Sequence, residues 1–146
     1  MTIYLATDHA GFELKEKVKK FLTSFSYTVE DCGAYTLDSN DDYPDFVHKA
    51  AGAVSKDPKN SRGIIFGSSG EGEAMVANRH AGVRAAVLYA YNEDIIRLSR
   101  EHNDANILSL GARFLAEEQA LHAVKLWLET PFSEEERHKR RIKKID

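Results

Sequence analysis

The sequence predicts an α/β fold, in which a parallel sheet of five strands carries helices on both of its faces. Short β-branched runs alternate with stretches of helical periodicity, and the order of strand then helix recurs five times along the chain. The length of 146 residues is that of one domain, and 42% hydrophobic residues suffice for an ordinary globular core. We therefore expect a single domain over residues 1–146, with right-handed crossovers between its strands.

Three strands and two helices are predicted in the first half of the chain. The strands follow β-branched runs, namely TIYLAT (2–7), TVEDC (28–32) and RGIIF (62–66). The first helix is predicted by apolar residues at mostly helical spacing: Phe12, Leu14, Val18, Phe21 and Leu22. The second helix, over 43–54, gathers on one face Phe46, Val47, Ala50, Ala51 and Val54.

The second half continues the same alternation. A glycine-rich turn follows the third strand, and a helix is predicted after it over about 71–78. The fourth strand is predicted by VRAAVLY (83–89) and the fifth by residues 106–110, with a helix over 92–102 between them. A further helix over 116–129 follows the fifth strand, so every strand is succeeded by a helix.

A last helix is predicted beyond Pro131, which breaks the chain. Ser133 and Glu136 have the spacing of a capping box, and acids at 134–136 precede bases at 137–144, as the helix dipole favours. Few of its residues are apolar. We therefore expect this C-terminal helix to lie on a surface or to extend to a partner subunit.

Charge, cysteine content and hydropathy exclude several classes of function. A net charge of −3 gives no general case for nucleic acid or a membrane surface as partner, and no apolar stretch approaches the length of a membrane span. The single cysteine, Cys32, forms no internal disulfide, fits a reducing compartment and is expected to be a small buried hydrophobic residue. We expect a cytoplasmic protein without a signal peptide. The six histidines are scattered, so no metal is expected.

Polar clusters follow the predicted strands, where parallel sheets bind their ligands. They are Asp8-His9, the loop 67–73, residues 89–91 and residues 111–113. His102 and Asn103 end a helix just ahead of the fifth strand. We expect several of these polar groups to meet at one edge of the sheet.

The loop Gly67-Ser68-Ser69-Gly70-Glu71-Gly72-Glu73 carries the most chemical information. It matches neither a Walker A loop nor the G-x-G-x-x-G fingerprint, and its two carboxylates would repel a bound phosphate. One interpretation is a nest of backbone N–H groups that holds a transient oxyanion beside a general base. The alternative is a tight turn whose acids only cap the following helix.

The other candidates each have a structural alternative. Asp8 can be a helix N-cap with His9 on the surface, and His102 can be a cation at a helix end. Arg137 and Arg141 share one helix face and can grip a phosphate or form a solvated basic stripe. The aromatic ring of Tyr43, in Asp41-Asp42-Tyr43-Pro44, can pack in the core or stack on a sugar.

Taken together, these segments resemble the ribose-5-phosphate isomerase B family, which also includes galactose-6-phosphate and allose-6-phosphate isomerases. The matching motifs keep their order over nearly the whole chain: DHAGFELK from Asp8, DCG from Asp31, DYP from Asp42, GSSGEGE from Gly67, ANR ending at Arg79, REHNDAN from Arg100, LGAR ending at Arg113 and RHKRRI from Arg137. Each motif is weak alone, but the ordered set is specific.

The resemblance implies a Rossmann-like three-layer α/β/α sandwich, no metal and no organic cofactor. It implies a homodimer or tetramer with active sites shared between subunits, acting on a small phosphorylated sugar, by default ribose 5-phosphate. The substrate-binding residues that it implies are Asp8, His9, Ser68, Ser69, Gly70, Glu71, Gly72, Asn103, Arg113, Arg137 and Arg141. The loop backbone would hold the enediolate oxygens, and His102, a catalytic residue outside that set, would assist ring opening.

One position departs from the commonest family pattern. Many members carry a catalytic cysteine where this chain has Gly67, and a second subgroup uses the glutamate that ends G-x-G-E. This chain resembles that subgroup, which assigns the base to Glu73 rather than Glu71. Two rival interpretations remain open: a flavodoxin-like binding module for a nucleotide or flavin, and a family member that has become a regulator without isomerase activity.

Overall fold

The central sheet has five parallel strands in the order β2-β1-β3-β5-β4. The structure is a computed structural model, and it describes residues 1–145. The strands are β1 (Thr2–Thr7), β2 (Thr28–Asp31), β3 (Ser61–Gly67), β4 (Ala85–Leu88) and β5 (Ile107–Gly111). The predicted parallel sheet is therefore confirmed, with β3 at its centre.

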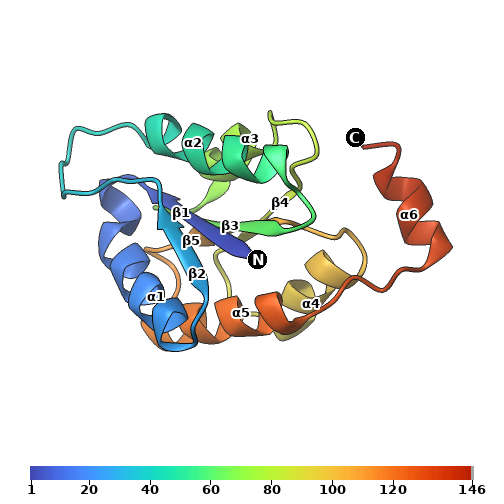
Figure 1. The fold of residues 1–146 in the computed structure, drawn as a ribbon. Coiled ribbons are helices and arrows are strands. Elements are labelled where there is room, and N and C mark those ends of the chain that lie inside the picture. The colour runs from blue at the N-terminus through green and yellow to red at the C-terminus, as the bar shows by residue number, and fades with distance from the viewer. Residues whose placement is uncertain (146) are drawn as a thin grey trace.

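Helices cover both faces of the sheet and make a three-layer sandwich (Figure 1). They are α1 (Phe12–Ser24), α2 (Tyr43–Lys56), α3 (Glu71–Ala77), α4 (Glu93–Glu101), α5 (Glu117–Glu129) and α6 (Glu136–Ile142), with a single 3₁₀ turn, η1 (His9–Gly11). In Figure 1, α2 and α3 lie above the sheet and α1, α4 and α5 below it. Among the described helices, none is long and apolar enough to cross a bilayer.

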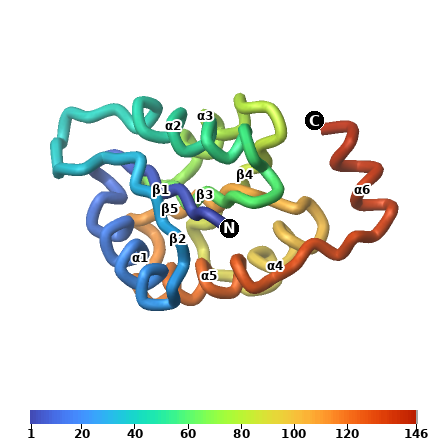
Figure 2. The backbone as a smooth tube through the Cα atoms, viewed as in Figure 1, coloured from blue at the N-terminus to red at the C-terminus, as the bar shows by residue number. Residues whose placement is uncertain are grey.

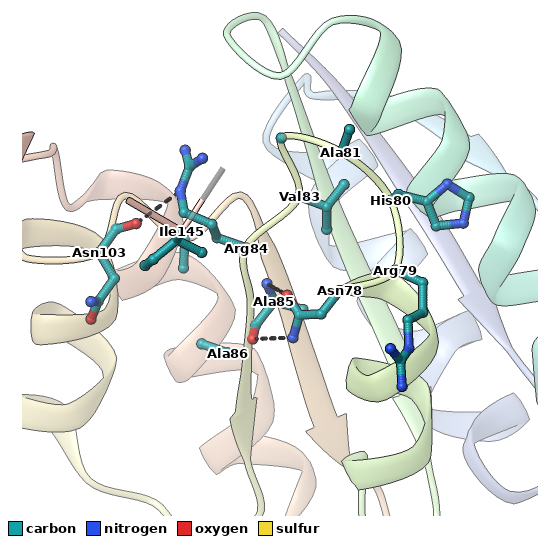
Figure 3. Close-up of a pocket in the computed structure, with 12 residues that line it drawn as sticks. Asn78, Arg79, His80, Ala81, Val83, Arg84, Ala85, Ala86, Asn103 and Ile145 are labelled. Carbon is teal, nitrogen blue, oxygen red and sulfur yellow. Dashed lines mark hydrogen bonds between the residues drawn. The ribbon is translucent and has the colours of Figure 1, made fainter. Parts of the chain in front are cut away.

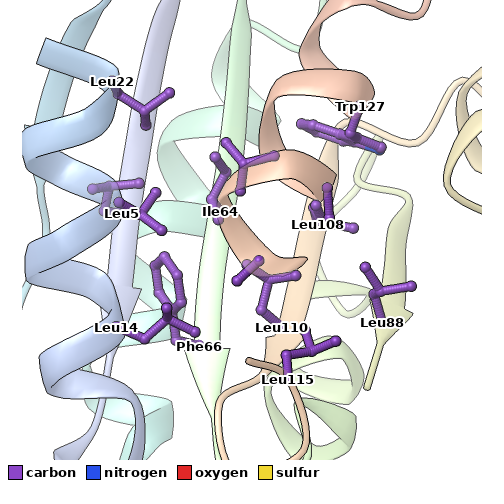
Figure 4. Close-up of a cluster of buried hydrophobic side chains, with 14 of the residues drawn as sticks. Leu5, Leu14, Leu22, Ile64, Phe66, Leu88, Leu108, Leu110, Leu115 and Trp127 are labelled. Carbon is purple, nitrogen blue, oxygen red and sulfur yellow. The ribbon is translucent and has the colours of Figure 1, made fainter. Parts of the chain in front are cut away.

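Large apolar side chains fill the layer between the sheet and α1, α4 and α5. Figure 4 shows Leu14 and Leu22 of α1 and Trp127 of α5 pointing at the sheet. Phe66 and Trp127 are fully buried, and burial of such a side chain contributes roughly 1.5–3 kcal/mol. Because the strands are clamped by this packing, the positions of their carboxyl ends are fixed.

The opposite layer is built from smaller residues. Ala50 and Ala51 of α2 are fully buried, which brings the helix backbone close to the sheet. Ala77 of α3 joins the same cluster: α2 packs over β1 and β3, and α3 lies beside it over β3, β4 and β5. This layer carries the glycine-rich loop and α3 into their place above the strand ends.

The C-terminal helix differs from the prediction at its start. The capping box of Ser133 and Glu136 is wrong: α6 begins at Glu136, and its N-cap is Glu135, without a side-chain cap. The Ser133 hydroxyl instead faces the Glu135 N–H at 3.5 Å, and the Ser133 N–H donates to the Glu101 carbonyl. Glu134 has a left-handed backbone with φ of 58°, which breaks the register that a capping box needs.

The body of α6 stands apart from the three layers (Figures 1 and 2). Its one buried residue is His138, whose Nδ1 lies 3.1 Å from the His102 carbonyl oxygen. Arg137 and Arg141 are exposed, which confirms the expected surface position of this helix. It sits near the amino ends of β3 and β4, since Ile142 lines a cavity with Arg62 and Arg84.

Candidate active site

Asp8 and the loop 67–73 lie together at the carboxyl edge of the sheet, because β1 and β3 are parallel neighbours in register. Asp8 follows β1 directly, and its carboxylate accepts the Ala10 N–H at 2.9 Å as the N-cap of η1. It is 7% exposed, so the cap is largely buried. Its capping role does not remove it from the site, because its charge acts on Glu73.

The loop is held in shape by the end of β5. The Gly70 carbonyl accepts the Ser109 hydroxyl at 2.6 Å, and the Ala112 N–H donates to the Gly67 carbonyl at 2.8 Å. Gly70 has φ of 83°, a left-handed conformation that only glycine adopts without strain. Within residues 1–145, the N–H groups of Ser69 and Gly70 donate to no protein acceptor. The loop thus presents backbone donors that a ligand oxygen can take.

Glu73 is the buried acid of the loop. Its residue is 4% exposed, and its carboxylate occupies the space beside Gly67 where any other residue would carry a side chain: a Cβ built on Gly67 overlaps the Glu73 carboxylate. Burial raises the pKa of the Glu73 carboxyl group, its own backbone N–H lowers it, and the charge of Asp8 raises it further. A raised carboxyl pKa suits a group that takes and returns a proton near neutral pH.

Glu71 has a different environment, although it lies only two residues away. It is exposed in the first turn of α3, and its backbone N–H donates weakly to the Ser69 hydroxyl at 3.3 Å. The two carboxylates of the loop are thereby told apart, one on the surface and one in the interior. This agrees with the choice of Glu73 over Glu71 as the base.

His9 is bound by an acid that lies 32 residues further along the chain. Asp41 Oδ1 accepts the His9 backbone N–H at 2.9 Å and faces the ring Nδ1 at 2.7 Å. The hydrogen bond to Asp41 raises the pKa of His9, burial lowers it, and the Asp8 charge raises it again. The ring is thus held as a hydrogen-bond donor and favours the cationic form.

The same residues have the spacing of a metal-binding group. Asp8, His9 and Asp41 each place one ligand atom within 4.8 Å of the others, the one such group found among residues 1–145. A ring nitrogen that donates a proton to Asp41 cannot at the same time ligate a cation, and metal binding needs the neutral ring. The raised pKa of His9 therefore makes this cluster a better hydrogen-bonded cation than a metal site.

His9 and Arg113 line one cavity of about 400 Å³ at this edge. Arg113 is exposed and follows β5, while its backbone N–H donates to the Ser68 carbonyl at 3.1 Å. A guanidinium and an imidazolium on one cavity wall form a suitable site for a phosphate dianion. Glu13 and the ion pair of Lys17 with Glu117 complete the charged groups of this wall.

Tyr43 both packs in the core and reaches the loop. Its ring joins the cluster beneath α2, and its hydroxyl lies against Gly72, where an added Cβ would approach the Oη to 2.7 Å. Because Gly72 is glycine, the phenol can lie directly on the backbone of the loop. Tyr43 is therefore a wall of the site.

His102 and Asn103 lie at the other edge of the sheet, contrary to the expectation that they join the polar groups at one edge. Helix α4 runs back from the carboxyl end of β4, so its last turn lies near the amino end of β5. Asn103 lines a cavity of about 690 Å³ with Arg84 and Ile145, and its carbonyl accepts the Arg84 Nε–H at 3.0 Å (Figure 3).

Arg137 and Arg141 are found near this second group, on α6. The centroid of the His138 ring, from the same helix, is 4.2 Å from that of the His102 ring. Helix α6 therefore packs against the turn that follows α4. Arg137 Nε donates to Glu135 at 2.7 Å, and both arginines are exposed. The predicted site residues therefore form two groups in one chain, around Glu73 and around His102.

Three residues of these groups escaped sequence reasoning. In the sequence, Asp41 belongs to a segment marked by an aromatic residue, and nothing distinguishes Ser109 or His138. Ser109 fixes the loop and His138 fixes the His102 turn. No local signal marks these roles, because each partner is distant in sequence.

Comparison with known proteins identifies the family of the chain. A family model described as Ribose/Galactose Isomerase matches residues 3–145. A ribose-5-phosphate isomerase B from Mycolicibacterium paratuberculosis is 42% identical over 142 residues, covering 97% of this chain and 87% of the relative.

Solved structures extend the likeness to three dimensions. Ribose-5-phosphate isomerase B from Mycoplasma genitalium, with bound ribulose-5-phosphate, has a TM-score of 0.94 at 37% identity, covering 99% of this chain and 93% of that one. A ribose 5-phosphate isomerase from Thermotoga maritima has a TM-score of 0.91 at 43% identity, covering 99% and 97%. The chain belongs to the ribose/galactose isomerase family.

Proposed function

We propose that this protein interconverts ribose 5-phosphate and ribulose 5-phosphate, with Glu73 as the group that moves the proton. The observation that carries the proposal is the buried Glu73 carboxylate, set beside a loop whose Ser69 and Gly70 N–H groups have no acceptor among residues 1–145. An aldose–ketose isomerase needs this pair of a base and oxyanion donors. The Mycoplasma genitalium relative was solved with ribulose-5-phosphate bound, which supports the choice of sugar.

The proton transfer follows from these positions. In the open-chain aldose, Glu73 takes the proton from C2 and the electron pair of that C–H bond forms the enediolate double bond. The negative charge then rests on the oxygens, where the loop N–H groups donate to it. Glu73 returns its proton to C1, while a hydroxyl proton passes between O2 and O1, and the ketose results. No metal is needed in these steps, since the charge is met by backbone donors.

The phosphate group belongs, in this proposal, to the cavity of His9 and Arg113. Both can carry positive charge there, and hydrogen bonds to ionised groups contribute roughly 1.5–3 kcal/mol each. In the same proposal, Asp8 binds a sugar hydroxyl. The loop Ser68–Gly72, with the Tyr43 hydroxyl against Gly72, lines the sugar in this proposal.

We further propose that a second copy of the chain completes each site. His102, Asn103, Arg137 and Arg141 lie at the amino edge of the sheet, whereas Glu73 and His9 lie at its carboxyl edge, so one chain cannot bring both groups to one sugar. A homodimer in which the two edges of different subunits face each other joins them. The second copy then supplies His102 for ring opening, Asn103 for sugar oxygens and the two arginines for the phosphate.

Subunit complementation tests the shared site. An inactive Glu73→Gln protein is mixed with an inactive Arg137→Ala/Arg141→Ala protein under conditions that exchange subunits. A mixed dimer with shared sites has one site with both defects and one with neither, so activity returns. If activity does not return although mass spectrometry shows mixed dimers, each subunit uses its own arginines and the shared site is refuted.

The activity itself is tested with a panel of aldose phosphates, namely ribose, allose and galactose phosphates, each with and without excess EDTA. We expect ribose 5-phosphate to be turned over best, with equal rates in both series. Activity that vanishes with EDTA and returns with a divalent ion contradicts the metal-free mechanism. Absence of turnover on the whole panel favours the regulator, and a copurified chromophore favours the flavin-binding module. The half-buried Cys32 thiol, whose pKa is raised by burial, suits the reducing cytoplasm that we propose for this enzyme.

A further inference from the structure

Asp41 makes an unusual pair of contacts with a single residue. One of its oxygens, Oδ1, accepts the backbone N–H of His9 at 2.9 Å. The same oxygen lies 2.7 Å from the ring Nδ1 of His9. The Asp41 side chain is 9% exposed and lies in the loop before α2, on a different element from His9. Two contacts to one residue fix both the position of its backbone and the rotation of its ring.

We propose that Asp41 is a positioning residue, which keeps the His9 imidazole in its cationic form and oriented so that Nε2–H is the donor offered to the phosphate of the substrate. The inference rests on the proposed function, because it takes the ligand of the cavity shared by His9 and Arg113 to be a sugar phosphate. Asp41 itself does not touch that ligand in this proposal, since its Oδ1 is occupied by His9.

The charges around His9 favour this role for Asp41 over the other nearby acids. Asp8 Oδ2 is 4.0 Å from the ring Nδ1, beyond hydrogen-bond distance, and Arg113 opposes the cationic form. In the same cavity wall, Glu117 is paired with Lys17 at 2.7 Å, which leaves Glu13 as the remaining acid. The hydrogen bond that the His9 ring donates to Asp41 is the largest cause that raises the pKa of His9.

Asp41 acts on His9 through its charge as well as through the hydrogen bond, since both raise the pKa of the ring. Oδ2 is buried and has no hydrogen-bond partner among residues 1–145. An asparagine would keep the acceptor toward His9 and lose the negative charge. Asp41→Asn therefore separates the electrostatic role from the steric one. Asp42→Asn is the matched control, because Asp42 is adjacent and exposed and its side chain makes no cap hydrogen bond.

The experiment combines an NMR titration with phosphate binding. The ring protons of His9, assigned with His9→Gln, are followed against pH in the wild type, Asp41→Asn and Asp42→Asn, and binding of inorganic phosphate is measured by calorimetry. We expect the pKa of His9 to lie above the ordinary histidine value of about 6.5 in the wild type and to fall in Asp41→Asn alone. Phosphate should then bind about tenfold more weakly to Asp41→Asn at neutral pH, with the difference shrinking in mild acid, where the ring is protonated in both proteins.

Turnover adds a readout that a structural defect would not imitate. In Asp41→Asn the KM for ribose 5-phosphate should rise about tenfold at neutral pH, while kcat at saturation changes by no more than about twofold. Titration of His9 at or below its ordinary pKa in the wild type overturns the proposal even if Asp41→Asn fails to fold. The proposal is also overturned if Asp41→Asn lowers kcat and raises KM together, by the same factors at every pH. The titration and the phosphate binding need no turnover. Absence of isomerase activity would therefore refute the proposed function, while these two measurements would still decide the role of Asp41.

Discussion

Substitution of Gly67 by alanine is the change whose consequence the structure defines most closely. Gly67 ends β3, and a Cβ at this position overlaps all three atoms of the Glu73 carboxylate. Something must move, and the movable partner is the end of the flexible Glu73 side chain, because the backbone on the other side is a buried strand paired to β5. We therefore expect Gly67→Ala to fold and to displace the base.

The size of the effect follows from the overlap. Ordinary contacts of a Cβ begin at about 3.4 Å, so the carboxylate must retreat by more than about 1 Å, and misplacement of a catalytic group by that distance costs about 10²-fold in rate. Stability should change by less than about 1 kcal/mol, since the displacement also releases a carboxylate from a buried position. The alanine thus separates activity from stability.

Steady-state kinetics and urea denaturation check this prediction together. Gly63→Ala is the control from the same strand: its Cβ meets the buried Ile107 side chain at 2.8 Å, so it should lose about 1–3 kcal/mol of stability while the folded protein keeps its kcat. If Gly67→Ala retains kcat within about threefold of the wild type, the Glu73 carboxylate is not the base in the position that the structure gives it.

Four further predictions concern the pH dependence of activity, the pH dependence of stability, ring opening and the cysteine. Since burial raises the pKa of Glu73 and the base must be ionised, kcat/KM should fall on the acid side at a higher pH than an ordinary glutamate titrates, and this limb should be absent from the residual activity of Glu73→Gln. By the same shift, ionised Glu73 opposes folding above its unfolded pKa, so Glu73→Gln should unfold at higher urea than the wild type at neutral pH and lose that advantage in acid; equal midpoints at neutral pH would contradict the burial argument. His102→Ala should slow turnover of cyclic ribose 5-phosphate far more than that of an aldose phosphate too short to close, and equal losses would remove His102 from ring opening. Cys32→Ser should keep kcat within about twofold, because Cys32 directly follows β2 and does not lie in the loop 67–73; a large loss of kcat would assign Cys32 a role in the reaction.

Much of the fold was predictable because its signals are local. The alternation of β-branched runs and amphipathic stretches predicts both ends of β1 correctly. It predicts the ends of α2 and α3 to within about two residues. The predicted fourth strand is too long. Val83 and Arg84 continue the strand-like pattern of the sequence, but the pairing of β4 with β5 begins only at Ala85. The start of α6 was wrong for the opposite reason: the spacing of Ser133 and Glu136 fits a capping box, but a left-handed Glu134 lies between them.

In the candidate site, too, some features can be predicted from the sequence and others depend on the folded structure. The choice of Glu73 came from motif spacing, while its burial against Gly67 depends on how β3 and α3 pack and has no sequence signature. His102 was expected near the loop, although a helix that returns from a strand's carboxyl end must finish at the amino edge of the sheet. Asp41 reaches His9 across 32 residues, so only the folded structure brings the pair together.

The most direct test of the account is the kinetics of ribose 5-phosphate isomerisation in EDTA for the wild type, Glu73→Gln and Glu71→Gln. Loss of a general base typically lowers the rate about 10²–10⁴-fold, and we predict a fall of this size in the kcat of Glu73→Gln. The Glu73→Gln protein should still bind ribulose 5-phosphate. The kcat of Glu71→Gln should fall by less than about threefold. In heavy water, the wild type should also place deuterium at C1 of the ketose, as proton return by an exchanging carboxylate requires. Full turnover by Glu73→Gln, or a larger loss in Glu71→Gln, would contradict the central claim.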